Sequence, residues 1–160
     1  MQDVKICCFT GHRTIEAHHV KQLPELLQRT LDDLVEEGYE VFRAGGAIGF
    51  DTLAALKVLE QKKSHPHIRL ELILPCRDQT ARWGEYHRSV YDYILTQADR
   101  IVYTSERYTP GCMAQRNRML VNGSLCCVAF CSKQSGGSAY TLQYAHRKGL
   151  RTINLYDEVL

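Results

Sequence analysis

One glycine-rich segment of the chain has the residue types of a phosphate-binding loop. It runs from Gly45 to Asp51 as Gly-Gly-Ala-Ile-Gly-Phe-Asp, between an apolar run at 39–44 and a helix-like segment that starts at Thr52. Glycine permits positive φ angles and a close approach of a ligand to the backbone, and the first amides of a following helix point outward without partners. We therefore expect Gly45, Gly46 and Gly49 to hold phosphate, although the segment matches neither G-x-G-x-x-G nor G-x-x-x-x-G-K-[ST].

A second segment, 135–141, repeats this arrangement with the sequence Ser-Gly-Gly-Ser-Ala-Tyr-Thr. Gly136 and Gly137 precede another helix-like run, and the hydroxyls of Ser138 and Thr141 could donate hydrogen bonds to phosphate oxygens. The alternative for Ser138 is an N-cap, because serine is common at the start of a helix.

Charged and polar side chains accompany these glycines. Arg13 and Arg116 could bind a phosphate or pyrophosphate through their forked guanidinium groups. Asp51 could hold a ribose hydroxyl or a ligand amide, or it could cap its helix. His12 could bond a ligand or transfer a proton, although a bond within its own turn is the simpler interpretation. Asn117 could contact a base or a ribose, or a neighbouring loop backbone.

The elements that must position these residues alternate along the chain. Strand-like segments cover 4–9, 39–44, 68–74, 100–103, 125–131 and 152–155, and helix-like segments lie near 20–37, 52–64, 83–97, 113–121 and 139–148. Alternation of this kind is typical of an α/β fold with a mostly parallel sheet. We predict a Rossmann-like three-layer sandwich that forms a single domain over 1–160.

In such a sheet ligands bind beyond the carboxyl ends of the strands, where successive loops converge. The first of these loops contributes Gly11 together with His12 and Arg13. The remaining ones are 45–51, 75–78, 112–117 and 135–141. Glycines, hydroxyls and arginines thus gather on one edge, which predicts a binding site there. Trp83, the only tryptophan, could stack on a base or pack into the core.

Composition narrows the functional class. A chain of 160 residues with 44% hydrophobic and 24% charged residues is the size of one globular domain. The formal charge of +2 argues against a strong non-specific nucleic-acid binder. No apolar run approaches the roughly 18 residues of a membrane span, so we expect no membrane partner and a cytoplasmic location.

Cysteine and histidine spacing predicts neither disulfides nor a metal site. Seven cysteines include two adjacent pairs inside apolar runs, Cys7-Cys8 and Cys126-Cys127, where buried thiols fit better than disulfides. The pairs His18-His19 and His65-x-His67 lack the partners that a structural zinc site needs.

The motifs taken together resemble the YpsA-like branch of the SLOG superfamily. The ordered set covers nearly the whole chain: Phe9-Thr10-Gly11-His12-Arg13, the 45–51 segment, Leu74-Pro75 with Trp83 downstream, Tyr108-x-Pro110-Gly111, Arg116-Asn117 and Gly136-Gly137-Ser138-x-Tyr140-Thr141. The resemblance implies a Rossmann-like fold that binds a nucleotide or a nucleotide-derived ligand such as ADP-ribose or an NAD-like molecule. No cofactor is certain beyond such a ligand.

The same superfamily includes the LOG phosphoribohydrolases and the DNA-processing protein DprA. The chain departs from the LOG motif P-G-G-x-G-T-x-x-E, with Ser135 for its proline, Ala139 and Tyr140 for its third glycine and threonine, and Gln143 for its catalytic glutamate. An amide cannot transfer a proton as a carboxylate does, so the LOG reaction is not expected. Asn122 also replaces an aspartate that the YpsA-like pattern has.

We therefore expect a domain that binds or senses a small nucleotide-like molecule. The first alternative is an N-glycosidic or phosphoribosyl hydrolase in which Asp51, Asp78 or Glu85 replaces the missing acid. The second is DprA-like binding of single-stranded DNA, which the balanced charge disfavours. Exposed helix faces could support a homodimer.

Overall fold

The computed structural model describes residues 3–132 and 135–159, so positions 1, 2, 133, 134 and 160 of the predicted domain lie outside the described residues. Strands and helices alternate through these residues as predicted. The strands are β1 (Lys5–Gly11), β2 (Tyr39–Ala44), β3 (Arg69–Leu74), β4 (Arg100–Tyr103), β5 (Cys126–Phe130) and β6 (Arg151–Asn154). The α-helices are α1 (Gln22–Glu36), α2 (Phe50–Ser64), α3 (Glu85–Gln97), α4 (Cys112–Val121) and α5 (Gly137–Arg147).

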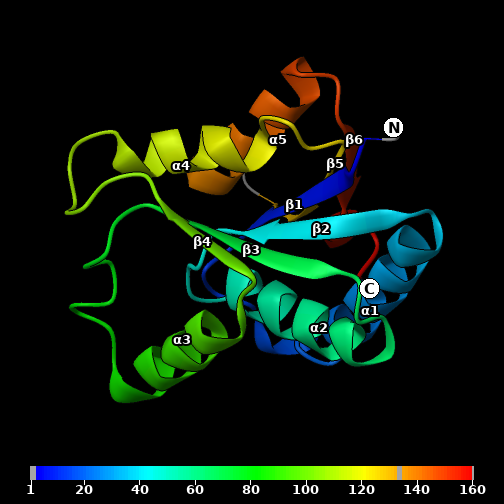
Figure 1. Ribbon diagram of the computed structural model, residues 1–160, viewed down its shortest axis with the longest axis horizontal. Coiled ribbons are helices and arrows are strands. Elements are labelled where there is room, and N and C mark those ends of the chain that lie inside the picture. The colour runs from blue at the N-terminus through cyan, green and yellow to red at the C-terminus, as the bar shows by residue number, and fades with distance from the viewer. Residues whose placement is uncertain (1–2, 133–134, 160) are drawn as a thin grey trace.

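The strands form one sheet in the order β4-β3-β2-β1-β5-β6 (Figure 1). Every pairing between these strands is parallel. The chain builds the sheet outward from β1 to β4, then returns and continues from β5 on the other side of β1. The direction of winding therefore reverses between β1 and β5, and the predicted Rossmann-like α/β fold is confirmed.

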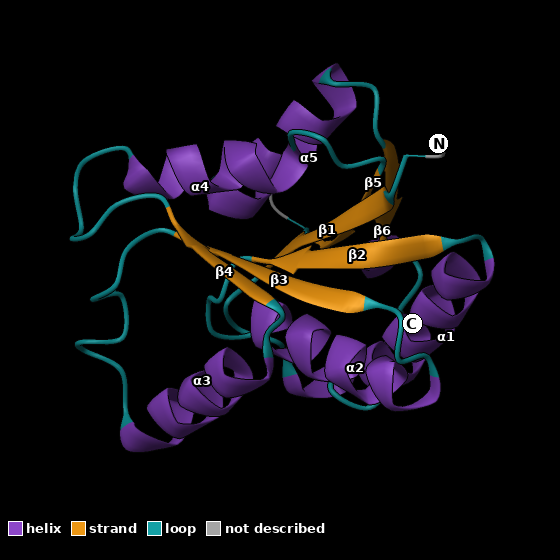
Figure 2. Cartoon of the chain, in the orientation of Figure 1, coloured by secondary structure: helices purple, strands orange, loops and turns teal. Residues whose placement is uncertain are grey.

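This reversal explains the two helical layers. Crossovers between parallel strands are right-handed, so helices that connect strands in opposite directions cover opposite faces of the sheet. Helices α1, α2 and α3 lie on one face, and α4 and α5 lie on the other (Figure 2). Every loop that follows a strand opens at the same edge of the sheet.

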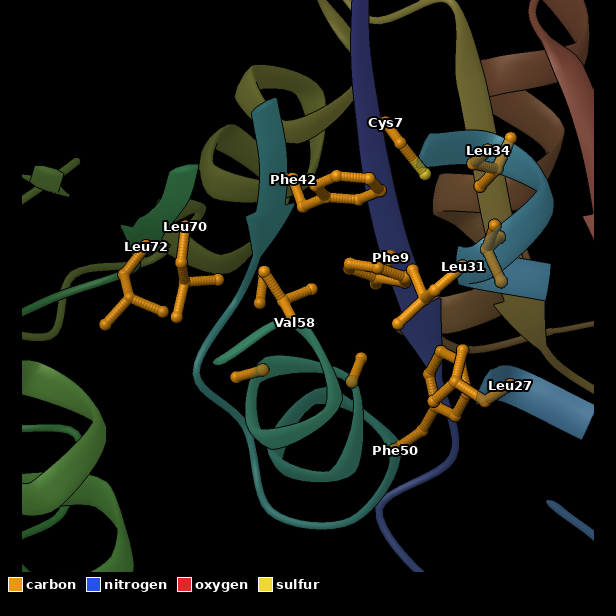
Figure 3. Close-up of a cluster of buried hydrophobic side chains, with 14 of the residues drawn as sticks. Cys7, Phe9, Leu27, Leu31, Leu34, Phe42, Phe50, Val58, Leu70 and Leu72 are labelled. Carbon is orange, nitrogen blue, oxygen red and sulfur yellow. The ribbon is translucent and has the colours of Figure 1, made fainter. Parts of the chain in front are cut away.

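The larger hydrophobic cluster lies between the sheet and the layer of α1 and α2 (Figure 3), and a smaller one packs against α4 and α5. Helix α1 buries a stripe at helical spacing: Leu23, Leu27, Leu31 and Leu34, each 0% exposed. The ring of Phe9 on β1 stacks on Phe42 of β2 and meets Phe50 of α2 edge to face. Strand β5 is buried along its whole length, as the continuous apolar run at 125–131 predicts.

The sequence reading missed two short 3₁₀-helices. They are η1 (Ala17–His19), which precedes α1, and η2 (Leu155–Asp157), which follows β6. Helix α3 begins at Glu85 rather than at Trp83, whose ring packs edge to face against Tyr91 at 5.4 Å. Trp83 therefore follows the core-packing alternative.

All seven cysteines are buried free thiols. Cys7 and Cys8 lie beside Cys126 and Cys127 on the neighbouring strand. Burial raises the pKa of Cys7 well above its ordinary value, which keeps the thiol protonated and unreactive. Within residues 3–132 and 135–159, no helix combines the length and the hydropathy needed to cross a membrane.

Candidate functional site

A cavity of about 720 Å³ opens at the carboxyl edge of the sheet, where β1 and β5 lie side by side. This is the crevice that a winding reversal creates in a parallel sheet, and its volume suits a small molecule. Nine of the residues that we expected at the site line it: Gly11, His12, Arg13, Asp51, Arg116, Asn117, Gly136, Gly137 and Ser138.

The loop after β1 is held between two other elements. The amide of His12 donates to the carbonyl of Phe130 at 3.1 Å, and the amide of Phe50 donates to the carbonyl of His12 at 3.0 Å. The ring atom Nε2 of His12 accepts from the amide of Ser132 at 2.8 Å and lies 2.9 Å from its hydroxyl. His12 thus bonds the loop after β5 rather than its own turn, which corrects our simpler interpretation.

The glycines after β2 lie elsewhere than we expected. Gly45, Gly46 and Gly49 do not line the cavity; from this loop only Ala47 and Asp51 reach it. A Cβ atom on Gly45 would lie 2.7 Å from Nη1 of Arg116 and 2.9 Å from Oδ2 of Asp51. Gly49, at a φ of 91°, leaves room for the carbonyl of Arg13. These glycines therefore admit close protein contacts rather than a ligand.

Arg116 on α4 is the most deeply placed cation of the cavity, with 5% of its surface exposed. Its Nε donates to Oδ1 of Asn117 at 2.7 Å, and its Nη1 donates to the carbonyl of Gly45. In the described part of the chain, Nη2 of Arg116 has no hydrogen-bond partner. Every side-chain nitrogen in that part that lacks a partner is accessible to solvent. Solvent therefore reaches Nη2, and Arg116 lines the cavity. Arg13, by contrast, is an exposed residue at the rim.

Asp51 is a buried carboxyl group in the first turn of α2, and the N-cap of that helix is Gly49. The capping alternative for Asp51 is therefore wrong. Oδ2 of Asp51 accepts from the amide of Ala47 at 3.2 Å. Burial raises the pKa of Asp51 to about 6, against the opposing effects of Arg116, the Ala47 amide and Arg13. At neutral pH most of the carboxyl is ionised.

The amino terminus of α5 opens into the cavity at Gly136, its N-cap, and Gly137. Two hydroxyls that we expected to bind phosphate are already used. Ser138 donates to the carbonyl of Gly11 at 2.7 Å, so it neither caps the helix nor has a donor to spare. Thr141 is 0% exposed, donates to the carbonyl of Gly137 at 2.9 Å and does not line the cavity.

Sequence reasoning missed an aromatic cluster at the same cavity. It comprises Phe130 at the end of β5, His19 of η1 and Tyr156 of η2, together with His12. Tyr156 follows the sixth strand, so the rule that selected the other loops would have found it had it been applied there. His19 carried no signal beyond its adjacent histidine, His18, and that pair alone does not predict a site.

Other expected groups lie apart from the cavity. The stretches 75–82 and 104–111 contact each other. Arg77 forms an ion pair with Glu106 at 2.8 Å, and Asp78 accepts a hydrogen bond from the amide of Tyr108 at 3.1 Å. Of the three substitute acids, Asp51 lines the cavity, whereas Asp78 and Glu85 do not.

Of the positions that depart from the family patterns, Ser135 lines the cavity, whereas Gln143 and Asn122 lie outside it. Gln143 is exposed, and Asn122 accepts from the hydroxyl of Tyr144 at 2.8 Å. No cluster of three or more His, Cys, Asp or Glu side chains suited to a metal ion occurs among the residues that the structure describes.

The family model and the curated relatives that match this chain point to one family. The family model YpsA, described as the YspA SLOG family, matches residues 7–157. A UPF0398 protein of Bacillus pumilus is 31% identical over 127 residues, which cover 74% of this chain and 68% of the relative. A UPF0398 protein of Bacillus cereus is 28% identical over 156 residues, with 91% and 85% covered.

Two solved structures share the fold. DNA processing protein A of Streptococcus pneumoniae superposes with a TM-score of 0.67 at 17% identity, over 93% of this chain and 49% of that one. DNA processing protein A of Helicobacter pylori, whose structure concerns its single-stranded DNA binding mode, gives 0.66 at 20% identity, over 92% and 63%. This chain therefore spans 49% and 63% of those two proteins, and the likeness shows the fold alone.

Proposed function

This chain belongs to the YspA SLOG family, and we propose that it binds or senses a nucleotide or a nucleotide-derived ligand, such as ADP-ribose or an NAD-like molecule, in the cavity between β1 and β5. One observation carries the proposal. The same cavity contains an open helix amino terminus, a deeply placed arginine with a free guanidinium nitrogen and a buried carboxyl group.

The helix terminus and the arginines suit phosphate. The amides at the start of α5 and the positive end of its dipole stabilise an anion, and a helix terminus of this kind is a common phosphate site. Nη2 of Arg116 would add a charge-assisted hydrogen bond from within the cavity, and Arg13 would add a second charge from the rim.

Asp51 and Asn117 suit the sugar. An ionised carboxylate only accepts hydrogen bonds, and the hydroxyls of a ribose are donors. Asn117 lies beside the phosphate region, since its Nδ2 would be 3.8 Å from a Cβ atom on Gly137. Phosphate and sugar contacts would therefore come from neighbouring parts of one cavity.

Calorimetric titration with ADP-ribose, NAD and AMP tests the proposal. We expect at least one of them to bind with a Kd below about 1 mM, roughly 4 kcal/mol. The variant Arg13→Met should weaken that binding about tenfold, because it removes a charged donor from the rim. Arg29→Met, which changes an exposed arginine on α1, is the matched control and should change nothing. Absence of binding at millimolar concentration, or equal losses in both variants, would contradict the proposal.

Binding of single-stranded DNA is a second candidate, favoured by the fold that the chain shares with the two DNA processing proteins. Such binding rests on many phosphate contacts and weakens steeply with salt. The near-balanced charge of the chain argues against it. Fluorescence anisotropy with a labelled oligonucleotide distinguishes the candidates: tight binding at low salt that is lost at 200 mM salt, about 10³-fold or more, would reverse our ranking.

Hydrolysis of an N-glycosidic bond is a third candidate, supported by the raised pKa of Asp51 in the cavity. Incubation with nucleoside monophosphates followed by chromatography measures it. We expect no free base above the buffer control, because His12, the other expected group in the cavity that could transfer a proton, is already bonded to Ser132. Release of base that is lost in Asp51→Asn would establish turnover.

A further inference from the structure

The cavity has two chemically different sides. One, the polar half, consists of Arg116, Asn117, Gly136 and Gly137 and comes from α4 and α5. The other, the aromatic half, consists of His12, His19, Phe130 and Tyr156. Both η1 and η2, which supply His19 and Tyr156, contact α1, so these two short helices lie on the side of the sheet that α1 covers. The polar half explains phosphate and sugar binding but leaves the aromatic half without a role.

The rings of the aromatic half contact one another in a fixed pattern. The ring centroids of Phe130 and Tyr156 are 5.2 Å apart. Each histidine ring stands nearly perpendicular to both of them, at 5.2 to 6.1 Å. Rings at these separations pack as one aromatic cluster. Phe130 is 1% exposed and His12 and Tyr156 are half-buried, so the accessible aromatic surface comes mainly from His12 and Tyr156. Such a surface suits the face or the edge of a planar heteroaromatic group.

The backbone around this surface is fixed by one side chain. Oδ1 of Asn154 accepts from the amides of Cys131 and Tyr156 at 3.1 and 3.2 Å, and its Nδ2 donates to the carbonyl of Cys131 at 2.8 Å. Asn154 thereby ties η2 to the end of β5. The bonds between His12 and Ser132 fix a second ring. A surface that is ordered before the ligand arrives costs little entropy on binding.

His19 adds a polar group to the aromatic half. Its side chain is 5% exposed, and it lines the cavity. Neither of its ring nitrogens has a hydrogen-bond partner among the described residues, and no unpaired side-chain nitrogen there is fully shut off from solvent. Water can therefore reach the unpaired nitrogens of His19. A hydrogen bond to the edge of a bound ring would replace that water.

We propose that the aromatic half is a base-binding subsite, which stacks the heteroaromatic ring of a nucleotide against its aromatic surface and bonds the ring edge through His19. This inference rests on the proposed function and specifies it: the ligand carries a base as well as a phosphate. The base lies toward η1 and η2, and the phosphate lies toward the start of α5.

Paired titrations with AMP and ribose 5-phosphate test the subsite, since the two molecules share the sugar phosphate and differ in the base. We expect AMP to bind at least about tenfold more tightly. Tyr156→Leu should remove most of this difference by weakening AMP alone. Tyr156→Phe should retain it, because the ring remains. His19→Phe should weaken AMP about threefold or more and leave ribose 5-phosphate unchanged. Tyr86→Leu, at an exposed tyrosine of α3 that does not line the cavity, is the control.

The outcomes separate this inference from the proposed function. Equal affinities for AMP and ribose 5-phosphate would overturn the subsite and leave the phosphate site standing. Binding of neither molecule at millimolar concentration would overturn both. If Tyr156→Leu does not fold, saturation-transfer NMR on the unaltered protein decides. We expect the base protons H2 and H8 of AMP to receive more saturation than the ribose protons, and the reverse order would refute the subsite.

Discussion

Replacing Asp51 by asparagine should make the folded protein more stable at neutral pH. Asp51 is 6% exposed, and burial raises the pKa of its carboxyl from the ordinary 3.8 to about 6. A buried carboxyl whose pKa is raised binds its proton more tightly in the folded state than in the unfolded state. The folded state is therefore favoured fully below pH 3.8, and this contribution is lost as the pH rises through 6.

The magnitude follows from the size of the shift. A difference of roughly two pH units in the pKa corresponds to about 3 kcal/mol at pH 7. The substituted amide would have the shape of the protonated acid, and its oxygen could still accept from the amide of Ala47. Asp51→Asn should thus raise the free energy of unfolding by up to about 3 kcal/mol at pH 7 and by progressively less toward pH 4.

Urea denaturation of the unaltered protein and the variant between pH 4 and pH 8 measures this dependence. Asp99→Asn is the matched comparison with the opposite sign. Burial opposes the ionisation of Asp99, but the Lys62 ammonium and the Leu70 amide outweigh it and hold the pKa of Asp99 below its ordinary value. That variant should be less stable at pH 7, with a deficit that shrinks in acid. A gain for Asp51→Asn that does not vary with pH, or no gain, would refute the reasoning.

Three further predictions concern the loops and the ligand. Gly45→Ala should destabilise the fold by about 1–3 kcal/mol, because its methyl group would clash with Arg116 and Asp51. Gly84→Ala, which has open space around it but replaces the N-cap of α3, should cost about 1 kcal/mol or less in thermal melts. Ser138→Ala should cost about 1 kcal/mol in urea denaturation, because it removes the hydrogen bond to Gly11; an unchanged midpoint would contradict that role. A bound nucleotide should raise the melting temperature in proportion to the logarithm of its concentration, and a melting temperature unaffected by millimolar AMP would count against the site.

Much of the fold follows from periodicity in the sequence. The leucine stripe of α1 and the continuous apolar run of β5 identify their elements, because each pattern reports which surface is buried. The alternation of strands and helices then predicts a parallel sheet. The strand order does not follow from this alternation. The sequence therefore does not predict that β1 and β5 are neighbours in the sheet.

The site was only partly predictable for the same reason. Arg116 and Asp51 were selected because their loops end at the ligand edge, and the structure brings them together. Whether Gly45 contacts a ligand or other parts of the protein depends on which side chains approach its backbone. The nearest of them, Arg116, is distant in sequence, so the local sequence does not predict the contact. His19 and Tyr156 lie more than 130 residues apart on short 3₁₀-helices without a periodic signal.

A ¹⁵N-resolved NMR titration with ADP-ribose tests the central claim most directly, because it reports both whether the ligand binds and where. We predict the largest shifts at the amides of Gly11, Gly136 and Gly137 and at the side chain of Arg116. Shifts confined to the second, smaller cavity between α2 and α3, near Lys62 and Tyr93, would contradict the claim, as would unchanged spectra at millimolar ligand.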